Sequence, residues 1–271
     1  MRRLSSRCAY LVAGFHTGRL GIRTLLTRAA IVVNFPVEST TSKPSFVETL
    51  QVREGAQPLR SGEYTGFLTD TCMQFARASK DGSLLYAFMD WRHTSEIQQA
   101  GEAAYDRLIN VCCWVKSNGG MGSLYRSRHE MVFVFKKGIA PHINNVQLGK
   151  HGRYRTNVWE YAGYNSFGHD RDETLAWHPT VKPVPMLMDA IMDVTHPGDI
   201  VLDGFLGSGS TLIAAERTRR VCYGVELDPA YVDVTIQRWQ RETGQRAVLA
   251  DTGQTFDEVA AERGIQREVV S

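Results

Sequence analysis

The sequence predicts an α/β fold built on a mostly parallel, doubly wound sheet. Two observations lead to this fold class: short apolar runs alternate with segments of helical periodicity, and the order strand, turn, helix occurs twice between residues 199 and 243. Strands that alternate with helices pair in parallel, and the crossover helices cover both faces of the sheet. With 271 residues, 43% of them hydrophobic, the chain can bury the core of one large domain.

The predicted strands are apolar runs, and they lie at 31–35, 84–88, 109–115, 131–135, 199–203 and 221–226. A helix is expected after a capping box formed by Ser95 and Gln98, because apolar residues then recur at steps of three and four. Further helices are expected within 181–195 and after a glycine-rich turn at 204–209. A last helix follows Asp228, a good N-cap, with Pro229 at its first position.

Composition excludes some classes of protein. The net charge is only +2, so any basic surface for nucleic acid must be local. No apolar run reaches the roughly 18–20 residues of a membrane span, so no membrane partner is expected. The five cysteines form no CxxC pair, and no zinc motif is evident. Free thiols of this kind are typical of a reducing compartment, and we expect a cytoplasmic protein.

The first residues differ in composition from the rest. Residues 1–30 contain six arginines and no acid, which resembles a transit peptide and equally fits a divergent extension. We therefore divide the chain into an Arg-rich N-terminal segment (1–45), a main domain (46–250) and a C-terminal tail (251–271). Within the main domain, residues 136–177 show little periodicity, and long irregular segments of this kind are usually functional or disordered.

The stretch VLDGFLGSGS (201–210) reads as a buried strand, a glycine turn and a helix start. Gly207 and Gly209 allow the backbone to turn tightly and to approach a ligand, and a helix N-terminus receives polar or anionic groups. Asp203 ends one strand, where a carboxylate can meet a ligand amine. Glu226 ends the next strand, where an acid pairs with ribose hydroxyls in doubly wound sheets. Leu212 stands where a dinucleotide fingerprint has its third glycine, which disfavours NAD. A structural turn without a ligand is the alternative.

At this point the sequence resembles the amino-methylating DNA methyltransferases. HPTVKP (178–183), VLDGFLGSGSTLIAAE (201–216) and GVELDPAYVDVTIQRW (224–239) match that family's motifs in type, order and spacing. FMDWRH (88–93) and WVKSNGGMGSLYRSRHEMVFVFKKG (114–138) resemble its middle strands. The resemblance covers roughly residues 55–250 and implies a Rossmann-like fold that binds S-adenosylmethionine, with the circularly permuted motif order of the β group. It also implies that 136–177 holds target-recognition loops.

The resemblance also implies the residues of the cofactor site. The methionine part would be contacted by Asp203, Phe205, Gly207, Ser208, Gly209, Ser210 and Thr211. Glu226 would hold the ribose, while His178, Thr180 and Lys182 would close the other side. Three positions depart from the family pattern: Gly204 replaces a proline, Leu206 a common glycine and Ser210 a common threonine. Of these, Leu206 is expected to narrow the pocket.

The family's catalytic tetrad, Asp-Pro-Pro-Tyr or a close variant, has no recognisable counterpart. In the permuted order it belongs near AIVVNFPV (30–37). One alignment places Ala30, Ile31, Val32 and Val33 at its four positions, which leaves no acceptor. In the other, Asn34, Phe35 and Pro36 form a substitute with an amide, a ring and a proline at the end of a strand. A plain strand and turn is the third interpretation.

Candidate DNA contacts are basic side chains of the irregular segment and of the preceding glycine turn, because Lys and Arg neutralise phosphates and Arg reads base edges. They are Arg126, Arg128, Lys136, Lys137, Lys150, Arg153 and Arg155. Asp90 and Trp91, at the end of a strand, either line the cofactor or base pocket or serve the helix that follows.

Three functions compete at this stage. The first is S-adenosylmethionine-dependent methylation of an exocyclic amine in double-stranded DNA, with adenine N6 favoured over cytosine N4. The second is a non-catalytic relic or accessory module that binds the cofactor, DNA or both. The third, a dinucleotide oxidoreductase, is disfavoured by Leu212. Monomer and homodimer remain open.

Overall fold

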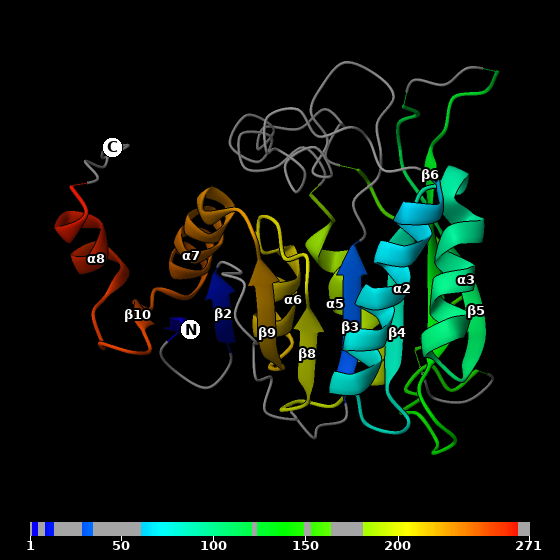
Figure 1. The fold of residues 1–271 in the computed structure, drawn as a ribbon, viewed down its shortest axis with the longest axis horizontal. Helices are drawn as coiled ribbons and strands as arrows, with labels where there is room; N and C mark the ends of the chain where they lie inside the picture. The colour runs from blue at the N-terminus through cyan, green and yellow to red at the C-terminus, as the bar shows by residue number, and fades with distance from the viewer. Residues whose placement is uncertain are drawn as a thin grey trace.

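The fold is seen in a computed structural model, which describes residues 2–4, 9–13, 29–34, 61–120, 124–148, 153–163 and 181–264, with side chains from residue 62 onward. The described strands form one ten-stranded sheet in the order β10-β1-β2-β9-β8-β3-β4-β6-β5-β7. Helices lie on both faces of this sheet (Figure 1). The predicted fold class, α/β with a mostly parallel, doubly wound sheet, is confirmed.

The element bounds are as follows. The strands are β1 (Arg2–Leu4), β2 (Ala9–Ala13), β3 (Ala29–Asn34), β4 (Leu84–Met89), β5 (Arg107–Val115), β6 (His129–Lys136), β7 (Val158–Glu160), β8 (Ile200–Asp203), β9 (Val221–Glu226) and β10 (Ala247–Leu249). The helices are α2 (Ser61–Ala78), the 3-10 turn η1 (Trp91–His93), α3 (Thr94–Ala104), α5 (Val184–Val194), α6 (Ser210–Arg217), α7 (Pro229–Thr243) and α8 (Phe256–Glu262).

The five central strands β2, β9, β8, β3 and β4 are all parallel. Their carboxyl ends therefore meet at one edge of the sheet, called the carboxyl edge below. β3 pairs with β8 through Ile31 and Leu202, and with β4 through Asn34 and Phe88. β6 is antiparallel to both β4 and β5, so the hairpin that joins β5 to β6 also lies at the carboxyl edge.

Two apolar cores flank the sheet. On one face, α2 and α3 pack Tyr64, Leu68 and Ile97 against side chains of β4 and β6. On the other face, α5, α6 and α7 bury a second cluster that includes Leu212 and Trp239. All six residues of β4 are buried, because a strand covered on both faces is apolar throughout rather than alternating.

Several local expectations fail. The sequence interpretation lacks β1, β2, β7, β10, α2 and α8. The strands β1, β2 and β3, which come from the Arg-rich segment, pair with strands from the rest of the chain. The capping box is also wrong. Ser95 lies inside α3, where its hydroxyl donates to Glu96 Oε2 at 3.0 Å. By contrast, Asp228 is confirmed as an N-cap, because its side chain accepts the amide of Ala230 at 2.8 Å.

Candidate active site

The glycine turn joins β8 to α6 at the carboxyl edge. Gly209 is the N-cap of α6 with φ of 82°, and a side chain at this position would place its Cβ 2.8 Å from Thr235 Cγ2. Only glycine fits both the left-handed backbone and the close approach of α7. Thr235 also donates its hydroxyl to the carbonyl of Gly207 at 2.8 Å, so a side chain of α7 holds the backbone of the turn.

Asp203 ends β8 and is almost fully buried, with 2% of its surface exposed. Its Oδ1 accepts the backbone amide of Phe205 at 3.0 Å. Burial raises the pKa of this carboxyl to about 6, although hydrogen bonds from Thr211 and Phe205 oppose the rise. At neutral pH the group is largely ionised, and a buried anion of this kind favours a cationic partner such as an ammonium group.

Glu226 ends the neighbouring strand β9 and is also buried. Its two oxygens accept the amides of Gly207 at 2.7 Å and Asp228 at 2.9 Å, so one carboxylate ties the glycine turn to the start of α7. Burial raises the pKa of Glu226, while these backbone hydrogen bonds oppose the rise. Each oxygen of a carboxylate has a second lone pair, so Glu226 still fits the predicted role with ribose hydroxyls.

The other predicted turn residues lie together here. Ser208, Ser210 and Thr211 are buried, and Arg238 donates to the Ser208 carbonyl and to Ser210 Oγ, both at 3.2 Å. Ser210 therefore keeps the hydroxyl that the family's threonine would supply. The ring of Phe205 meets the ring of Phe67 from α2 edge-on, with centroids 6.2 Å apart.

Packing explains the two other departures from the family pattern. A Cβ at Gly204 would lie 2.4 Å from the ring of Phe75, so α2 occupies the space that a proline would need. Leu206 is buried in the core on the α6 face, and its Cδ2 lies 2.4 Å from where a Cβ of Gly224 would stand. The leucine side chain is thus accommodated by a glycine in β9.

Lys182 is buried and bonded to a carboxylate that the sequence interpretation overlooks. Its Nζ lies 2.7 Å from Glu130 Oε2 at the start of β6, and Lys116 Nζ lies 2.5 Å from Glu130 Oε1. Burial alone would raise the pKa of Glu130, but Lys182 and Lys116 lower it to about 2. Two features of the sequence could have indicated this pair. A lysine that closes a cofactor pocket becomes buried and then needs an acid, and Glu130 is an acid at the start of an apolar strand. His178 and Thr180 lie outside the described residues.

The candidate acceptor Asn34 is the last residue of β3, at the carboxyl edge and between the ends of β8 and β4. It pairs with β4, as do the preceding residues Ala30, Ile31, Val32 and Val33. Phe35 and Pro36 lie outside the described residues.

Asp90 caps the 3-10 turn that follows β4. Its side chain accepts the amide of Arg92 at 2.7 Å and pairs with the Arg92 guanidinium at 3.1 Å. The sequence predicts that Asp90 either lines a pocket or caps the following helix. The structure favours capping, and the element that Asp90 caps is η1 rather than α3. Trp91 is half exposed beside it.

The predicted DNA-contacting residues do not form one surface. Arg126 and Arg128 are exposed on the β5–β6 hairpin at the carboxyl edge. Lys136 and Lys137 lie at the opposite edge, where Lys136 pairs with Leu84 at the start of β4 and Lys137 Nζ is 3.8 Å from Asp106. Lys150 lies outside the described residues.

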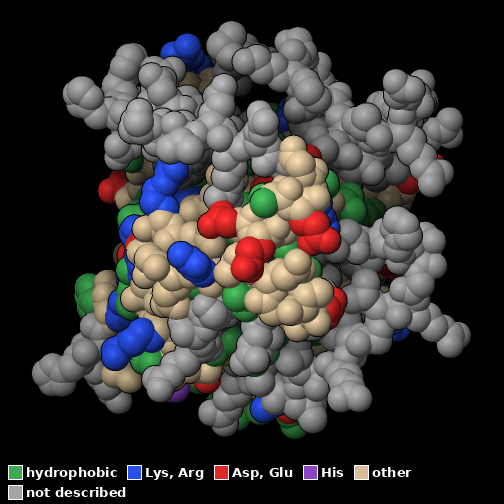
Figure 2. Space-filling model, turned by 90° about the vertical axis from the view of Figure 1, so that its left-hand side faces the viewer, with side chains coloured by type: hydrophobic (Ala, Val, Ile, Leu, Met, Phe, Trp, Pro, Cys, Tyr) green, Lys and Arg blue, Asp and Glu red, His purple; other side chains and the backbone are tan. Residues whose placement is uncertain are grey.

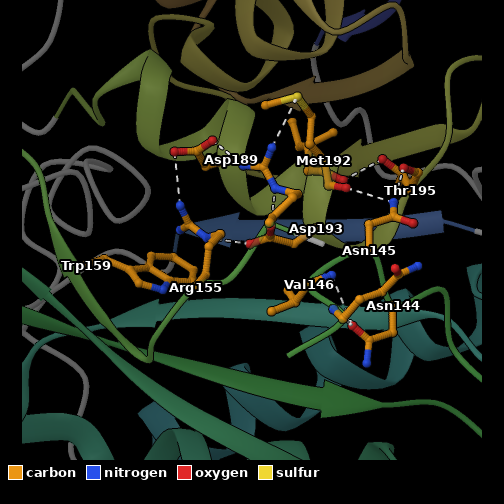
Figure 3. Close-up of polar contacts among 12 residues, drawn as sticks. Asn144, Asn145, Val146, Arg155, Trp159, Asp189, Met192, Asp193 and Thr195 are labelled. Carbon is orange, nitrogen blue, oxygen red and sulfur yellow. Dashed lines mark hydrogen bonds and ion pairs between the residues drawn. The ribbon is translucent and has the colours of Figure 1, made fainter. Parts of the chain in front are cut away.

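Arg153 and Arg155 are held by two acids of α5. Arg153 pairs with Asp189 and, at 2.5 Å, with Asp193, while Arg155 pairs with the same acids at 3.0 and 2.7 Å. Figure 3 shows Arg155 pointing from the loop toward Asp189 and Asp193, beside the ring of Trp159. This arrangement fastens the irregular segment to α5, and it favours a structural role for both arginines.

Helices that could cross a membrane are absent from the described part of the chain, since none is long and apolar enough. Nor do three or more His, Cys, Asp or Glu side chains gather as metal ligands among the residues with described placement.

The comparisons with known proteins define the family. The family model for DNA methylases of the N6/N4 type matches residues 40–237, and the chain therefore belongs to this family. The resemblance inferred from the motifs is confirmed, and so is S-adenosylmethionine as the cofactor that this family uses.

Individual relatives are distant. The chain is 26% identical over 204 residues to the YubD protein of Escherichia coli (strain K12). The aligned region covers 74% of this chain and 82% of YubD. Its structure is similar to PvuII DNA methyltransferase, which is cytosine-N4-specific, with a TM-score of 0.66, 16% identity and coverage of 88% of this chain and 89% of that one. It is also similar to the M1.HpyAVI complex with S-adenosylmethionine, with a TM-score of 0.54, 20% identity and coverage of 79% and 89%. At these identities the structural likeness concerns the fold.

Proposed function

We propose that this chain methylates an exocyclic amine of duplex DNA, with adenine N6 favoured over cytosine N4, and that Asn34 supplies the acceptor that the missing tetrad would provide. The observation that carries the proposal is the place of β3 in the sheet. It lies directly beside the cofactor strand β8, and Asn34 ends it at the same edge as the glycine turn.

The cofactor residues fit S-adenosylmethionine by their chemistry. Bound there, it supplies an electrophilic methyl group on a sulfonium. Asp203 is a buried carboxylate without a described basic side chain bonded to it, and it suits the amino group of the methionine part. Glu226 suits the ribose hydroxyls. The glycine turn between them leaves the backbone open to close approach.

The acceptor has a specific task. The lone pair of an exocyclic amine is delocalised into the ring, so the amine must be held by hydrogen-bond acceptors before it attacks. A flipped base can reach such acceptors, and the cost of flipping is offset by stacking in the pocket. The amide oxygen of Asn34 accepts from an amine N–H as the family's first tetrad residue does. The alternative alignment through Ala30–Val33 would leave the amine without a side-chain acceptor, because all four residues are apolar.

A cluster of Lys182, Glu130 and Lys116 lies at this edge of the sheet. The two ammonium groups share one carboxylate, and both lie over the ring of Trp114, at 5.4 and 4.6 Å from its centroid. Lys182 precedes Pro183, the N-cap of α5, so this cluster fastens the end of the HPTVKP motif to β5 and β6. We assign it a positioning role for that motif.

Transfer of a labelled methyl group to unmethylated plasmid DNA tests the proposal, with binding of S-adenosylmethionine measured by calorimetry alongside. We expect transfer by the natural chain, loss of at least about 100-fold in Asn34→Ala, and unchanged cofactor affinity in that variant, since removing a group that acts on the reacting amine lowers the rate without affecting cofactor binding. Digestion to nucleosides identifies adenine or cytosine as the substrate.

The accessory-module alternative predicts measurable cofactor binding and no transfer by the natural chain. Transfer that survives Asn34→Ala would leave methylation in place and remove Asn34 from it.

A further inference from the structure

We propose that the tip of the β5–β6 hairpin is a wedge that enters the base stack of DNA, with Leu124 and Tyr125 as the inserted side chains. This inference rests on the proposed function, because it states how the DNA substrate is opened at the same edge of the sheet.

The described part of the hairpin stays paired beyond its strands, as far as Gly120 and Ser127. Beyond the ends of the two strands, Lys116 donates its amide to the Arg128 carbonyl and Gly120 donates its amide to the Ser127 carbonyl, both at 2.7 Å. Arg128 Nε adds a bond to the Lys116 carbonyl at 3.0 Å. The described residues between β5 and β6 rise well past the carboxyl edge (Figure 1). Side chains at its tip are therefore carried outward on a paired scaffold.

Two large side chains sit next to each other at this tip and face water. Leu124 is 81% exposed and Tyr125 is 83% exposed. Single exposed apolar residues are ordinary on a protein surface. Here they are adjacent and lie at the end of a projecting hairpin, and apolar wedges that unstack base steps are presented to DNA in the same way.

The charges around the tip select DNA rather than a protein as the occupant. Residues 117–129 contain no Asp or Glu, and Arg126 and Arg128 flank the wedge on its C-terminal side with exposed side chains. The opposite end of the molecule differs: α8 exposes Asp257, Glu258 and Glu262, and acidic side chains gather at the centre of that end (Figure 2). Phosphates on either side of an opened base step would meet arginines without neighbouring acids at the hairpin end.

The hairpin lies at the edge of the sheet where a DNA base must be unstacked. The amine must leave the base stack to reach Asn34, and this unstacks a base step at some energetic cost. An aromatic ring and a leucine can occupy the space that the base leaves, and both stack or pack without reading its identity.

The first test does not depend on methyl transfer. Relaxed plasmid is incubated with saturating protein, treated with topoisomerase and deproteinised, and the change in linking number reports insertion between bases. The natural chain and Tyr125→Phe should unwind DNA, whereas Tyr125→Ala and Leu124→Ala should lose more than about half of the unwinding. Ile139→Ala is the matched control, because Ile139 is 91% exposed but follows β6 at the opposite edge.

The second test uses duplexes with the target base either paired or mispaired, once the methylated site has been mapped. The two alanine variants should lose about 10- to 100-fold in transfer on paired duplex and recover to within about threefold of the natural chain on mispaired duplex, because mispairing lowers the cost of flipping. Arg126→Ala, which removes a phosphate contact, should show no such recovery.

Equal unwinding by the natural chain and the alanine variants, or none by either, would overturn the wedge. A change in oligomeric state in Tyr125→Ala, with DNA unwinding unchanged, would instead make the tip a contact between two copies of this chain. If the natural chain unwinds DNA but transfers no methyl group, the wedge stands and the proposed function fails.

Discussion

At the scale of single residues, the buried Asp203 carboxylate of the cofactor site lowers the stability of the folded protein at neutral pH. The Asp203 carboxyl has a pKa of about 6 because it is buried, so folding favours its protonated form. A group with a raised pKa contributes stability that is present below its unfolded pKa, near 3.8, and is lost as the pH rises through about 6. At neutral pH the empty site is therefore less stable than it would be without the charge, and binding a cation relieves this.

Asp203→Asn tests this conflict between binding and stability. The amide keeps the acceptor for Phe205 but loses the charge, so we expect the cofactor-free protein to gain about 1–3 kcal/mol at pH 7.5. Cofactor affinity should fall by about 1–3 kcal/mol. Urea unfolding and calorimetry measure the two effects. Affinity of the natural chain should also drop as the pH is lowered through about 6, and it should drop less in the variant. Pairing between Asp203 and the ammonium group would be ruled out by equal pH profiles.

Glu226→Gln addresses the second acid. Two buried amides, those of Gly207 and Asp228, donate to this carboxylate, and a glutamine can accept well from only one of them. We expect a loss of about 1–3 kcal/mol in the free energy of unfolding, together with weaker cofactor binding. Glu242→Gln is the matched control, because Glu242 pairs with Arg217 at the surface, where ion pairs contribute about 0–1 kcal/mol. Equal effects of the two changes would contradict the assignment.

At the scale of elements, basic residues that look alike in the sequence have separate tasks. Arg153 and Arg155 fasten a loop to α5, whereas Arg126 and Arg128 stand on the exposed hairpin. The loop gains further anchors where Asn145 donates to the carbonyls of Met192 and Thr195, at 2.8 and 3.0 Å, as Figure 3 shows. The ion pairs and these bonds hold the loop against the end of α5.

Substitutions of Arg155 and Arg126 should therefore differ in their effects on stability and on the salt dependence of DNA binding. Arg155→Met leaves Asp193 with one ionic partner fewer, and we expect about 2–4 kcal/mol lower stability with an unchanged salt dependence of DNA binding. Arg126→Ala should leave stability unchanged and should reduce the slope of log affinity against log salt by about 1. Denaturant unfolding and fluorescence anisotropy at several salt concentrations measure both. A reduced slope in Arg155→Met would restore that arginine as a DNA contact.

At the scale of the whole molecule, local chemistry explains what could be predicted. The β8 turn and the Asp228 cap are encoded by adjacent residues, so the sequence predicts them directly. The carboxylates that hold Lys182, Arg153 and Arg155 lie far away in the sequence, and no pattern states that they meet. Helix α2 was missed because Gly62, Gly66 and three threonines lower its intrinsic propensity, and packing of Tyr64 and Leu68 outweighs this.

Sheet order supports the proposed place of Asn34. The sequence alone leaves three interpretations open: AIVV, NFP, or a plain strand and turn. The ladder with β4 places Asn34 at the end of β3, opposite Phe88, while the pairing of β3 with β8 ends at Ile31 and Leu202. Position along a strand depends on pairing partners far away in the chain, which is why this distinction requires the fold.

The pairing of β3 with β8 also bears on how the protein is made. β3 leaves the ribosome early, but one of its two neighbouring strands, Ile200–Asp203, is synthesised only much later. Until then the N–H and C=O groups on that edge of this apolar strand have no β8 partner, and contacts this distant in sequence form slowly. Nascent chains should therefore be prone to aggregation until synthesis passes β8, which makes chaperone capture during translation an expected requirement for a good yield.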